Sequence, residues 1–240
     1  MSQDSSVKRL KLTDQNSKGG VDPMDFALAR QNMVEGQIRT NRVTDQYLVD
    51  ALEQLPREAF VSAELKKLAY IDEDLTVAVG RILMEPMVMA RLLQAAHIED
   101  TDLCLVIGSA TGYEAAVIAK LASAVVAIDS NKALVKSATK NLAAQGSDTV
   151  SVLAGPLDQG QADQGPYDVI FINGGVADLP SALTEQLAEG GRLVYVQSQP
   201  RGTGKAMLVT KNIGVVSETD LFDANVPALP EFAAKPKFNF

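Results

Sequence analysis

The chain has 240 residues, 46% of them hydrophobic and 22% charged, a composition typical of a globular protein with a sizeable core. Its 30 acidic residues outnumber its 22 basic ones, and the formal net charge of −8 argues against sequence-independent binding of nucleic acid, which requires a basic face. The single cysteine, Cys104, excludes an intrachain disulfide, and the single histidine, His97, disfavours a His-rich metal site or a Ser-His-Asp triad.

The N-terminal region predicts neither a signal peptide nor a membrane span. Lys8, Arg9 and Lys11 are not followed by an apolar stretch, and no apolar run in the chain reaches the roughly 18 residues that a span requires. We therefore expect a cytoplasmic protein with a reduced thiol. Residues 1–22 are rich in Ser, Gln, Asp, Lys and Gly and lack an apolar period, which predicts a disordered tail.

Helical periodicity dominates the region from residue 23 to residue 100. Apolar residues recur at helical spacing over about residues 24–38, and again over 45–55, where Thr44 or Asp45 can cap the helix. Pro86 suits the first turn of a further helix that runs to about residue 96. This region is therefore predicted to form an N-terminal helical cap.

Short apolar runs alternate with helical patterns from residue 103 onward. The runs cover residues 103–107, 124–128, 150–153, 169–172 and 193–196, and the helical patterns cover 112–121, 131–144 and 179–187. This alternation predicts a mostly parallel sheet covered by helices on both faces.

The last part of the chain has a different pattern. Residues 206–210 and 215–221 flank Asn212-Ile213-Gly214, which predicts a hairpin and hence an antiparallel edge of the sheet. Residues 227–240 contain three prolines and three phenylalanines, which excludes a regular helix. We expect this segment to lie extended over the domain or over a partner protein.

The loop after the first predicted strand is the strongest candidate site. It reads Gly108-Ser109-Ala110-Thr111-Gly112, and small residues before a helix N-terminus let a ligand approach free N–H groups. The second predicted strand ends at Asp129, whose carboxylate can accept both hydroxyls of a ribose. The alternative is a tight strand-to-helix turn with a solvated aspartate. The spacing favours a nucleoside ligand.

Several segments in this order resemble the protein-L-isoaspartate O-methyltransferases, over roughly residues 24 to 200. The matching segments are Met33-Val34, Gln37-Ile38-Arg39, Leu55 to Val61, Gly108 to Tyr113, Ala115 to Val117, Val125 to Asp129, Tyr167 to Ile170 and Gln186 to Val194. The resemblance implies a Rossmann-like fold, S-adenosylmethionine as methyl donor, and methylation of the free carboxylate of isoaspartyl residues in proteins. It places the donor on a set of residues that we call the donor framework: Gly108, Ser109, Ala110, Gly112, Asp129, Ser130 and Leu157.

The departures from the family pattern fall on the site. In the donor region, Val106 replaces an acidic residue that receives the charged end of the donor, and Ala110 replaces a glycine. The family's Gly-Asp-Gly after the third strand is replaced by Gly155-Pro156-Leu157, with Asp158 displaced by two positions, and Pro156 lacks an N–H.

The acceptor loop also differs. It aligns with residues 80–86, where Met84 stands at the position of the acceptor-binding serine and Ile82 at that of a threonine. Methionine cannot donate a hydrogen bond, so no catalytic residue is assigned.

Three hypotheses follow. The first is an S-adenosylmethionine-dependent carboxyl methyltransferase with a changed acceptor site, acting on a protein or peptide carboxylate. The second is a catalytically inactive descendant that serves as a binding or scaffolding module, with the C-terminal tail as its docking segment. The third is a pocket that takes a different nucleoside through Asp129.

The corresponding division of the chain has three parts. They are a disordered tail over residues 1–22, a methyltransferase-like domain over 23–222, and an extended tail over 223–240. Within the domain, residues 23–100 form the helical cap and acceptor-loop region, and residues 101–222 form the Rossmann-like core.

Overall fold

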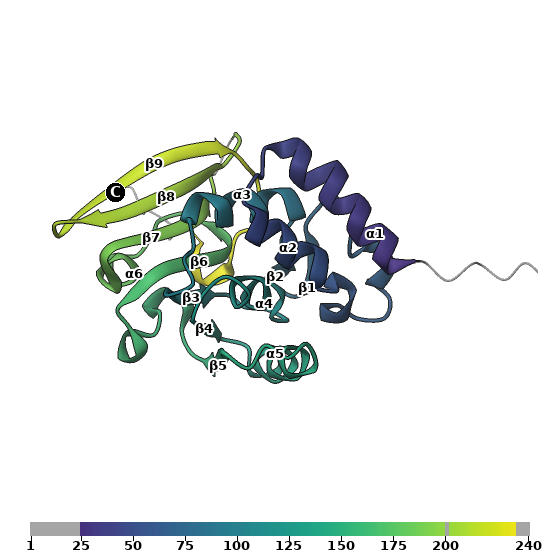
Figure 1. The fold of residues 1–240 in the computed structure, drawn as a ribbon. Coiled ribbons are helices and arrows are strands. Elements are labelled where there is room, and N and C mark those ends of the chain that lie inside the picture. The colour runs from purple at the N-terminus through teal and green to yellow at the C-terminus, as the bar shows by residue number, and fades with distance from the viewer. Residues whose placement is uncertain (1–24, 200–201, 234–240) are drawn as a thin grey trace, which may run out of the picture.

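The computed structural model describes residues 25–199 and 202–233 (Figure 1). The predicted N-terminal tail and the last seven residues of the predicted C-terminal tail lie outside the described residues. The division of the chain into domain and tails stays a prediction. No helix in the described ranges combines the length and the hydropathy that crossing a bilayer demands.

A seven-stranded sheet with the order β5-β4-β3-β6-β7-β8-β9 forms the centre of the fold. Its strands are β3 (Leu103–Ile107), β4 (Ala124–Asp129), β5 (Val150–Ala154), β6 (Tyr167–Val176), β7 (Leu187–Gln197), β8 (Lys205–Asn212) and β9 (Val215–Asp223). The pairs from β5 to β7 are parallel, and β8 and β9 add antiparallel pairs at one edge. The predicted mostly parallel sheet with an antiparallel edge hairpin is confirmed.

One face of this sheet is covered by the helices α1 to α5. They are α1 (Phe26–Met33), α2 (Gln46–Gln54), α3 (Pro86–Ala96), α4 (Tyr113–Ile118) and α5 (Lys132–Ala144). Figure 1 shows α1, α2 and α3 gathered beside the sheet as the expected helical cap. Asp45, rather than Thr44, caps α2, since its side chain accepts a hydrogen bond from the Leu48 N–H.

Strand alternation divides the core into two parts. Val106 and Phe171 face the helices α1–α5, whereas Ile107 and Ile172 face the opposite side. That second side is covered by the short helix α6 (Ser181–Glu185) and by residues near the C-terminus, including Leu229 and Phe232. The C-terminal segment therefore completes the second half of the core.

Short helical turns of other types fill the connections. They are the π-turn η1 (Val34–Ile38) and the 3₁₀ turns η2 (Arg39–Asn41), η3 (Arg57–Phe60), η4 (Lys66–Leu68), η5 (Leu157–Gln159), η6 (Ala162–Gln164) and η7 (Pro230–Phe232). One of these turns, η7, lies inside the predicted extended C-terminal tail, whose extent stays a prediction.

Three further details differ from the sequence prediction. The helix predicted over 179–187 is only α6, because β7 already begins at Leu187. The helix predicted over 112–121 ends at Ile118 in a tighter turn. An unpredicted two-stranded sheet joins β1 (Leu75–Ala78) to β2 (Arg81–Leu83), because strands this short carry too few residues to show a period of two.

Candidate functional site

All residues of the donor framework except Leu157 follow the carboxyl ends of β3 and β4, close to the point where the strand order reverses, and Leu157 lies on η5 after β5. The N–H groups of Gly108 and Ser109 both donate to the Ile128 carbonyl at 3.0 Å, which fastens the loop to β4. Gly108 and Gly112 have φ values of 73° and 97°, in the region that glycine adopts without strain. The structure thus brings the predicted loop and the end of β4 together.

Ala110 takes up the same left-handed conformation without being glycine. Its φ is 47°, a conformation that costs an ordinary residue roughly 1–2 kcal/mol. Its N–H donates to Asp129 Oδ2 at 3.0 Å. The replacement of the family glycine is therefore accommodated, and the strained residue is fixed by the carboxylate that ends β4.

Asp129 is fully buried, and its carboxylate is bound by the chain itself. Oδ1 accepts from the Asn131 N–H at 2.9 Å, and Oδ2 accepts from Ala110 and from Arg81 Nε, the latter at 2.9 Å. In this conformation the carboxylate oxygens of Asp129 that a ribose would use are taken by one guanidinium and two backbone N–H groups. Sequence reasoning did not single out Arg81.

Arg81 lies on β2 and also binds two further residues, Ser130 and Glu231, through three hydrogen bonds. Its Nη2 donates to Ser130 Oγ at 2.9 Å and to Glu231 Oε1 at 2.7 Å, and its Nη1 donates to Glu231 Oε2 at 3.2 Å. Although burial opposes the charge, the hydrogen bonds to Glu231 and Asp129 hold the pKa of Arg81 above its ordinary value. Burial also disfavours the charge on Glu231, but hydrogen bonds from Arg81 and Ser130 outweigh it and lower the Glu231 pKa.

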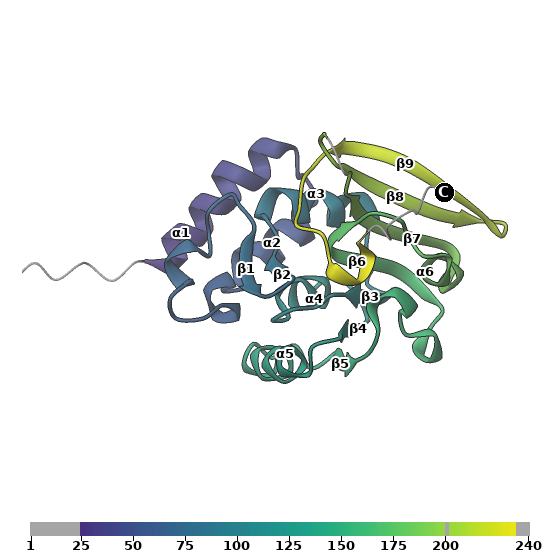
Figure 2. The same cartoon turned by 180° about the vertical axis from the view of Figure 1, so that it is seen from behind.

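Residues 226–232, which we call the C-terminal strap, cross the site. The Gly175 N–H donates to the Pro227 carbonyl at 2.9 Å, and the Leu229 N–H donates back to the Gly175 carbonyl at 2.9 Å. Figure 2 shows this segment in yellow, passing over β6 beside β3. A side chain of the strap, Leu229, is 1% exposed and packs over Gly108.

The other predicted site residues lie on either side of this arrangement. Ser130 is exposed at the end of β4, whereas Leu157 is fully buried in the same half of the core as Leu229. Met84 is also fully buried, with its N–H donating to Glu114 Oε1 at 3.3 Å. In this conformation the Met84 side chain cannot contact an acceptor.

A buried polar group on β6 links the acceptor loop to the donor loop. Asn173 Nδ2 donates to the carbonyls of Ile82 and Gly108, at 3.3 and 3.2 Å. Ser109 Oγ and Asn173 Oδ1 are buried and have no hydrogen-bond partner among the described residues. Buried polar atoms without partners are costly and are typical of sites that bind a ligand or water.

A second buried cluster lies behind the donor loop, around Arg57. The guanidinium is fully buried, donates to the carbonyls of Ala69 and Met84, and lies 5.0 Å from the centre of the Tyr113 ring. Burial raises the pKa of Glu114 to about 7, although the charge of Arg57 opposes the shift. Burial likewise raises the pKa of Tyr113 to about 12. This cluster positions the acceptor loop against α4.

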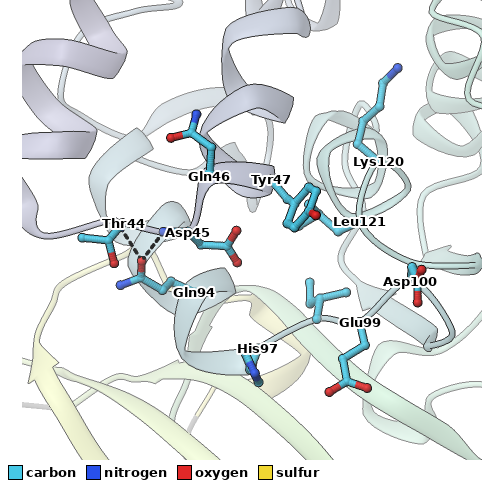
Figure 3. Close-up of a pocket in the computed structure, with 11 residues that line it drawn as sticks. Thr44, Asp45, Gln46, Tyr47, Gln94, His97, Glu99, Asp100, Lys120 and Leu121 are labelled. Atoms are coloured by element: carbon cyan, nitrogen blue, oxygen red, sulfur yellow. Dashed lines mark hydrogen bonds between the residues drawn. The ribbon is translucent and has the colours of Figure 1, made fainter.

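A cavity of about 900 Å³ lies elsewhere, at the end of the domain where β3 begins (Figure 3). Gln94 Oε1 there accepts from the N–H groups of Thr44 and Asp45 at 2.6 and 3.1 Å. The side chains of Tyr47, His97 and Lys120 also line it. None of the predicted donor residues contributes to this cavity. Across residues 25–199 and 202–233, no three His, Cys, Asp or Glu side chains converge as metal ligands.

The residues of the donor framework have the chemistry that a nucleoside donor requires, but the space beside them is filled. Arg81 occupies Asp129, and Leu229 occupies the surface of Gly108. A donor therefore does not fit this conformation of the site.

The fold and the position of the site define a protein of the Rossmann-like methyltransferase class. Two solved structures named as protein-L-isoaspartate O-methyltransferases share this fold. One superposes with a TM-score of 0.73 at 23% identity, covering 83% of this chain and 65% of the other. The second, a Plasmodium falciparum protein in complex with S-adenosyl-L-homocysteine, superposes with a TM-score of 0.72 at 19% identity, covering 87% and 100%.

Sequence similarity is more specific. The family model described as protein-L-isoaspartate(D-aspartate) O-methyltransferase matches residues 28–225. The protein-L-isoaspartate O-methyltransferase of Koribacter versatilis is 37% identical over 198 residues, 82% of this chain and 89% of that protein. The protein-L-isoaspartate O-methyltransferase 1 of Rhodopseudomonas palustris is 38% identical over 190 residues, 79% of this chain and 78% of that protein. The chain belongs to the protein-L-isoaspartate O-methyltransferase family, whose methyl donor is S-adenosylmethionine.

Proposed function

We propose that this protein is an S-adenosylmethionine-dependent methyltransferase of protein carboxylates, with isoaspartyl residues as its acceptor class, and that it acts in the cytoplasm. The supporting observation is that the family match over residues 28–225 includes a donor loop and an Asp129 held together at the carboxyl ends of β3 and β4. The inactive-module and alternative-nucleoside hypotheses have no comparable support.

The proposed donor residues are those of the donor framework. Gly108, Ser109, Ala110 and Gly112 form the loop, and Asp129 and Ser130 end β4. Leu157 is assigned to the wall of the adenine side, since it is in the apolar cluster beside the strap. No catalytic residue is assigned. A carboxylate acceptor is already ionised, so the protein must supply position and exclusion of water rather than a general base.

The acceptor is proposed to be held by groups other than Met84. Methionine at this position is fully buried and has no N–H or O–H on its side chain. The acceptor preference therefore needs a direct test with carboxylates of more than one kind.

The test is transfer of a labelled methyl group from S-adenosylmethionine to a peptide that carries one isoaspartyl residue. A peptide with a normal aspartyl residue at the same position, and one whose only carboxylate is its C-terminus, serve as competing acceptors. We expect methylation of the isoaspartyl peptide alone. If a folded protein that binds the donor methylated none of the three peptides, the acceptor assignment would be contradicted.

A substitution at Asp129 tests the donor assignment. Asp129→Asn keeps the size of the side chain but removes its charge, and we expect donor binding to weaken at least about tenfold, because hydrogen bonds to a charged group are the stronger kind. Asp163→Asn is the matched control, since Asp163 is exposed on η6. Equal donor binding by the two variants would contradict the role given to Asp129.

A further inference from the structure

The segment that fills the donor framework begins where the family match ends. The family model covers residues up to 225, and the C-terminal strap comprises residues 226–232. The strap therefore lies just beyond the segment that the family model matches.

The first contact is apolar. A Cβ atom built on Gly174 would lie 2.6 Å from Leu229 Cγ, and one built on Gly108 would lie 3.3 Å from Leu229 Cδ2. Leu229 thus rests directly on the backbone of two glycines, one in the donor loop and one near the end of β6. Glycines at these positions are what allows a ligand to approach a backbone closely, and here the ligand is a leucine of the same chain.

The second contact is electrostatic. Glu231 forms a two-pronged pair with Arg81, and Ser130 Oγ donates to Glu231 Oε1 at 2.6 Å. Arg81 in turn binds Asp129. Strap and donor framework are therefore joined by the direct hydrogen bond between Ser130 and Glu231 and by one guanidinium, 4% exposed, that lies between two carboxylates.

The third observation is that the closed arrangement does not satisfy the site completely. Ser109 Oγ and Asn173 Oδ1 remain buried without partners at the donor loop. A buried polar group without a partner costs free energy, which lowers the stability of the closed arrangement relative to one in which a polar ligand is bound.

From these contacts we infer that the strap, together with Arg81, is an intramolecular competitor of the methyl donor. Donor and strap use the same surface, so the donor binds only when residues 226–232 withdraw and Arg81 leaves Asp129. This inference rests on the proposed function, since it takes the donor framework as the donor site. The apparent dissociation constant is then the intrinsic one divided by the fraction of open molecules.

The experiment is calorimetric titration of the full chain with S-adenosylhomocysteine, the unreactive product of the donor. Glu231→Gln removes one carboxylate from Arg81, and Leu229→Ala removes the side chain over Gly108. We expect both variants to bind about tenfold more tightly than the unmodified chain, because each raises the open fraction.

Two matched controls separate this effect from a general loss of stability. Glu185→Gln changes an exposed glutamate on α6, and Leu193→Ala opens a cavity in the same half of the core on β7, which pairs with β6 and β8 rather than with β3 or β4. Both are expected to bind S-adenosylhomocysteine as the unmodified chain does.

Hydrogen exchange measures the strap independently of donor affinity. The Gly175 and Ala177 N–H groups donate hydrogen bonds to strap carbonyls, and the Leu229 N–H donates to the Gly175 carbonyl. All three should be protected in the free protein. Saturating S-adenosylhomocysteine should accelerate exchange of the Leu229 amide.

The outcomes are distinct. Equal or weaker binding by Glu231→Gln and Leu229→Ala, or an unprotected strap in the free protein, would overturn the competitor while leaving donor binding intact. Absence of binding by every variant, including those whose strap amides exchange freely, would overturn the donor site itself and the competitor with it.

Discussion

Arg81 and Asp129 are 48 positions apart in the chain, and their side chains meet at 2.9 Å in the centre of the donor framework. The pair joins the acceptor loop, through β2, to the strand end that is expected to hold the ribose of the donor. It therefore couples three events that would otherwise be separate: donor binding, the position of the acceptor loop and the position of the strap.

The first prediction concerns this pair. Arg81→Gln removes the guanidinium from Asp129 and Glu231, so S-adenosylhomocysteine should bind more tightly. The free protein should lose about 3 kcal/mol of unfolding free energy, because Asp129 remains buried without its charged partner. Titration and urea denaturation of the same sample measure both effects. Weaker binding, with the fold intact, would show that Arg81 assists the donor.

The second prediction concerns the contact between Gly80, in the β1–β2 turn, and Pro230 of the strap. A Cβ atom on Gly80 would lie 2.5 Å from Pro230 Cγ, and the φ of Gly80 is 66°, so Gly80→Ala adds both a clash and backbone strain. We expect faster exchange of the Leu229 amide. Gly214→Ala is the control, because Gly214 has a similar φ of 72° and open space around it. The same exchange rate in both variants would contradict contact between the β1–β2 turn and the strap.

The third prediction is a pH dependence. Burial raises the pKa of Glu114 to about 7, above its ordinary value of 4.5. The native state therefore keeps a proton that the unfolded chain has lost between these values, and stability should fall as pH rises from about 4.5 to about 7, by an amount on the order of 3 kcal/mol.

Glu114→Gln should flatten this part of the pH profile while keeping an oxygen that accepts from the Met84 N–H. Denaturant unfolding at half-unit pH intervals, for the unmodified chain and the variant, measures the difference. Parallel profiles would mean that Glu114 does not carry the raised pKa. Glu85→Gln is measured in the same way, because burial and neighbouring acids also raise the Glu85 pKa to about 7, so Glu85 contributes to the same part of the pH profile.

The fourth prediction concerns Arg57. Arg57→Met should cost about 3 kcal/mol of unfolding free energy, because it leaves the carbonyls of Ala69 and Met84 without a buried donor. Arg39→Met, at a side chain 38% exposed, should cost less than about 1 kcal/mol. Comparable losses in urea denaturation would show that the buried guanidinium is not a structural anchor of the acceptor loop.

Local pattern was sufficient for most elements of the fold. The strand over 103–107 and the helix over 86–96 have the predicted bounds, because a buried parallel strand is a short continuous apolar run and a helix beginning at Pro86 starts with a residue suited to its first turn. The donor loop followed from its small residues and from Asp129 at the end of the next strand. The sheet β1–β2 could not be predicted, since three or four residues show no reliable period.

The amino-acid sequence by itself determined the fold class and the family, and it predicted the residues of the donor framework, because these depend on periodicity and on motifs that are local in the chain. Only the tertiary structure decided what lies on that framework. Arg81 and Glu231 are 150 positions apart, and their pairing depends on β2 and the strap arriving at the same strand ends. A side chain's partner is set by the packing of distant elements, and no local pattern of residues encodes it.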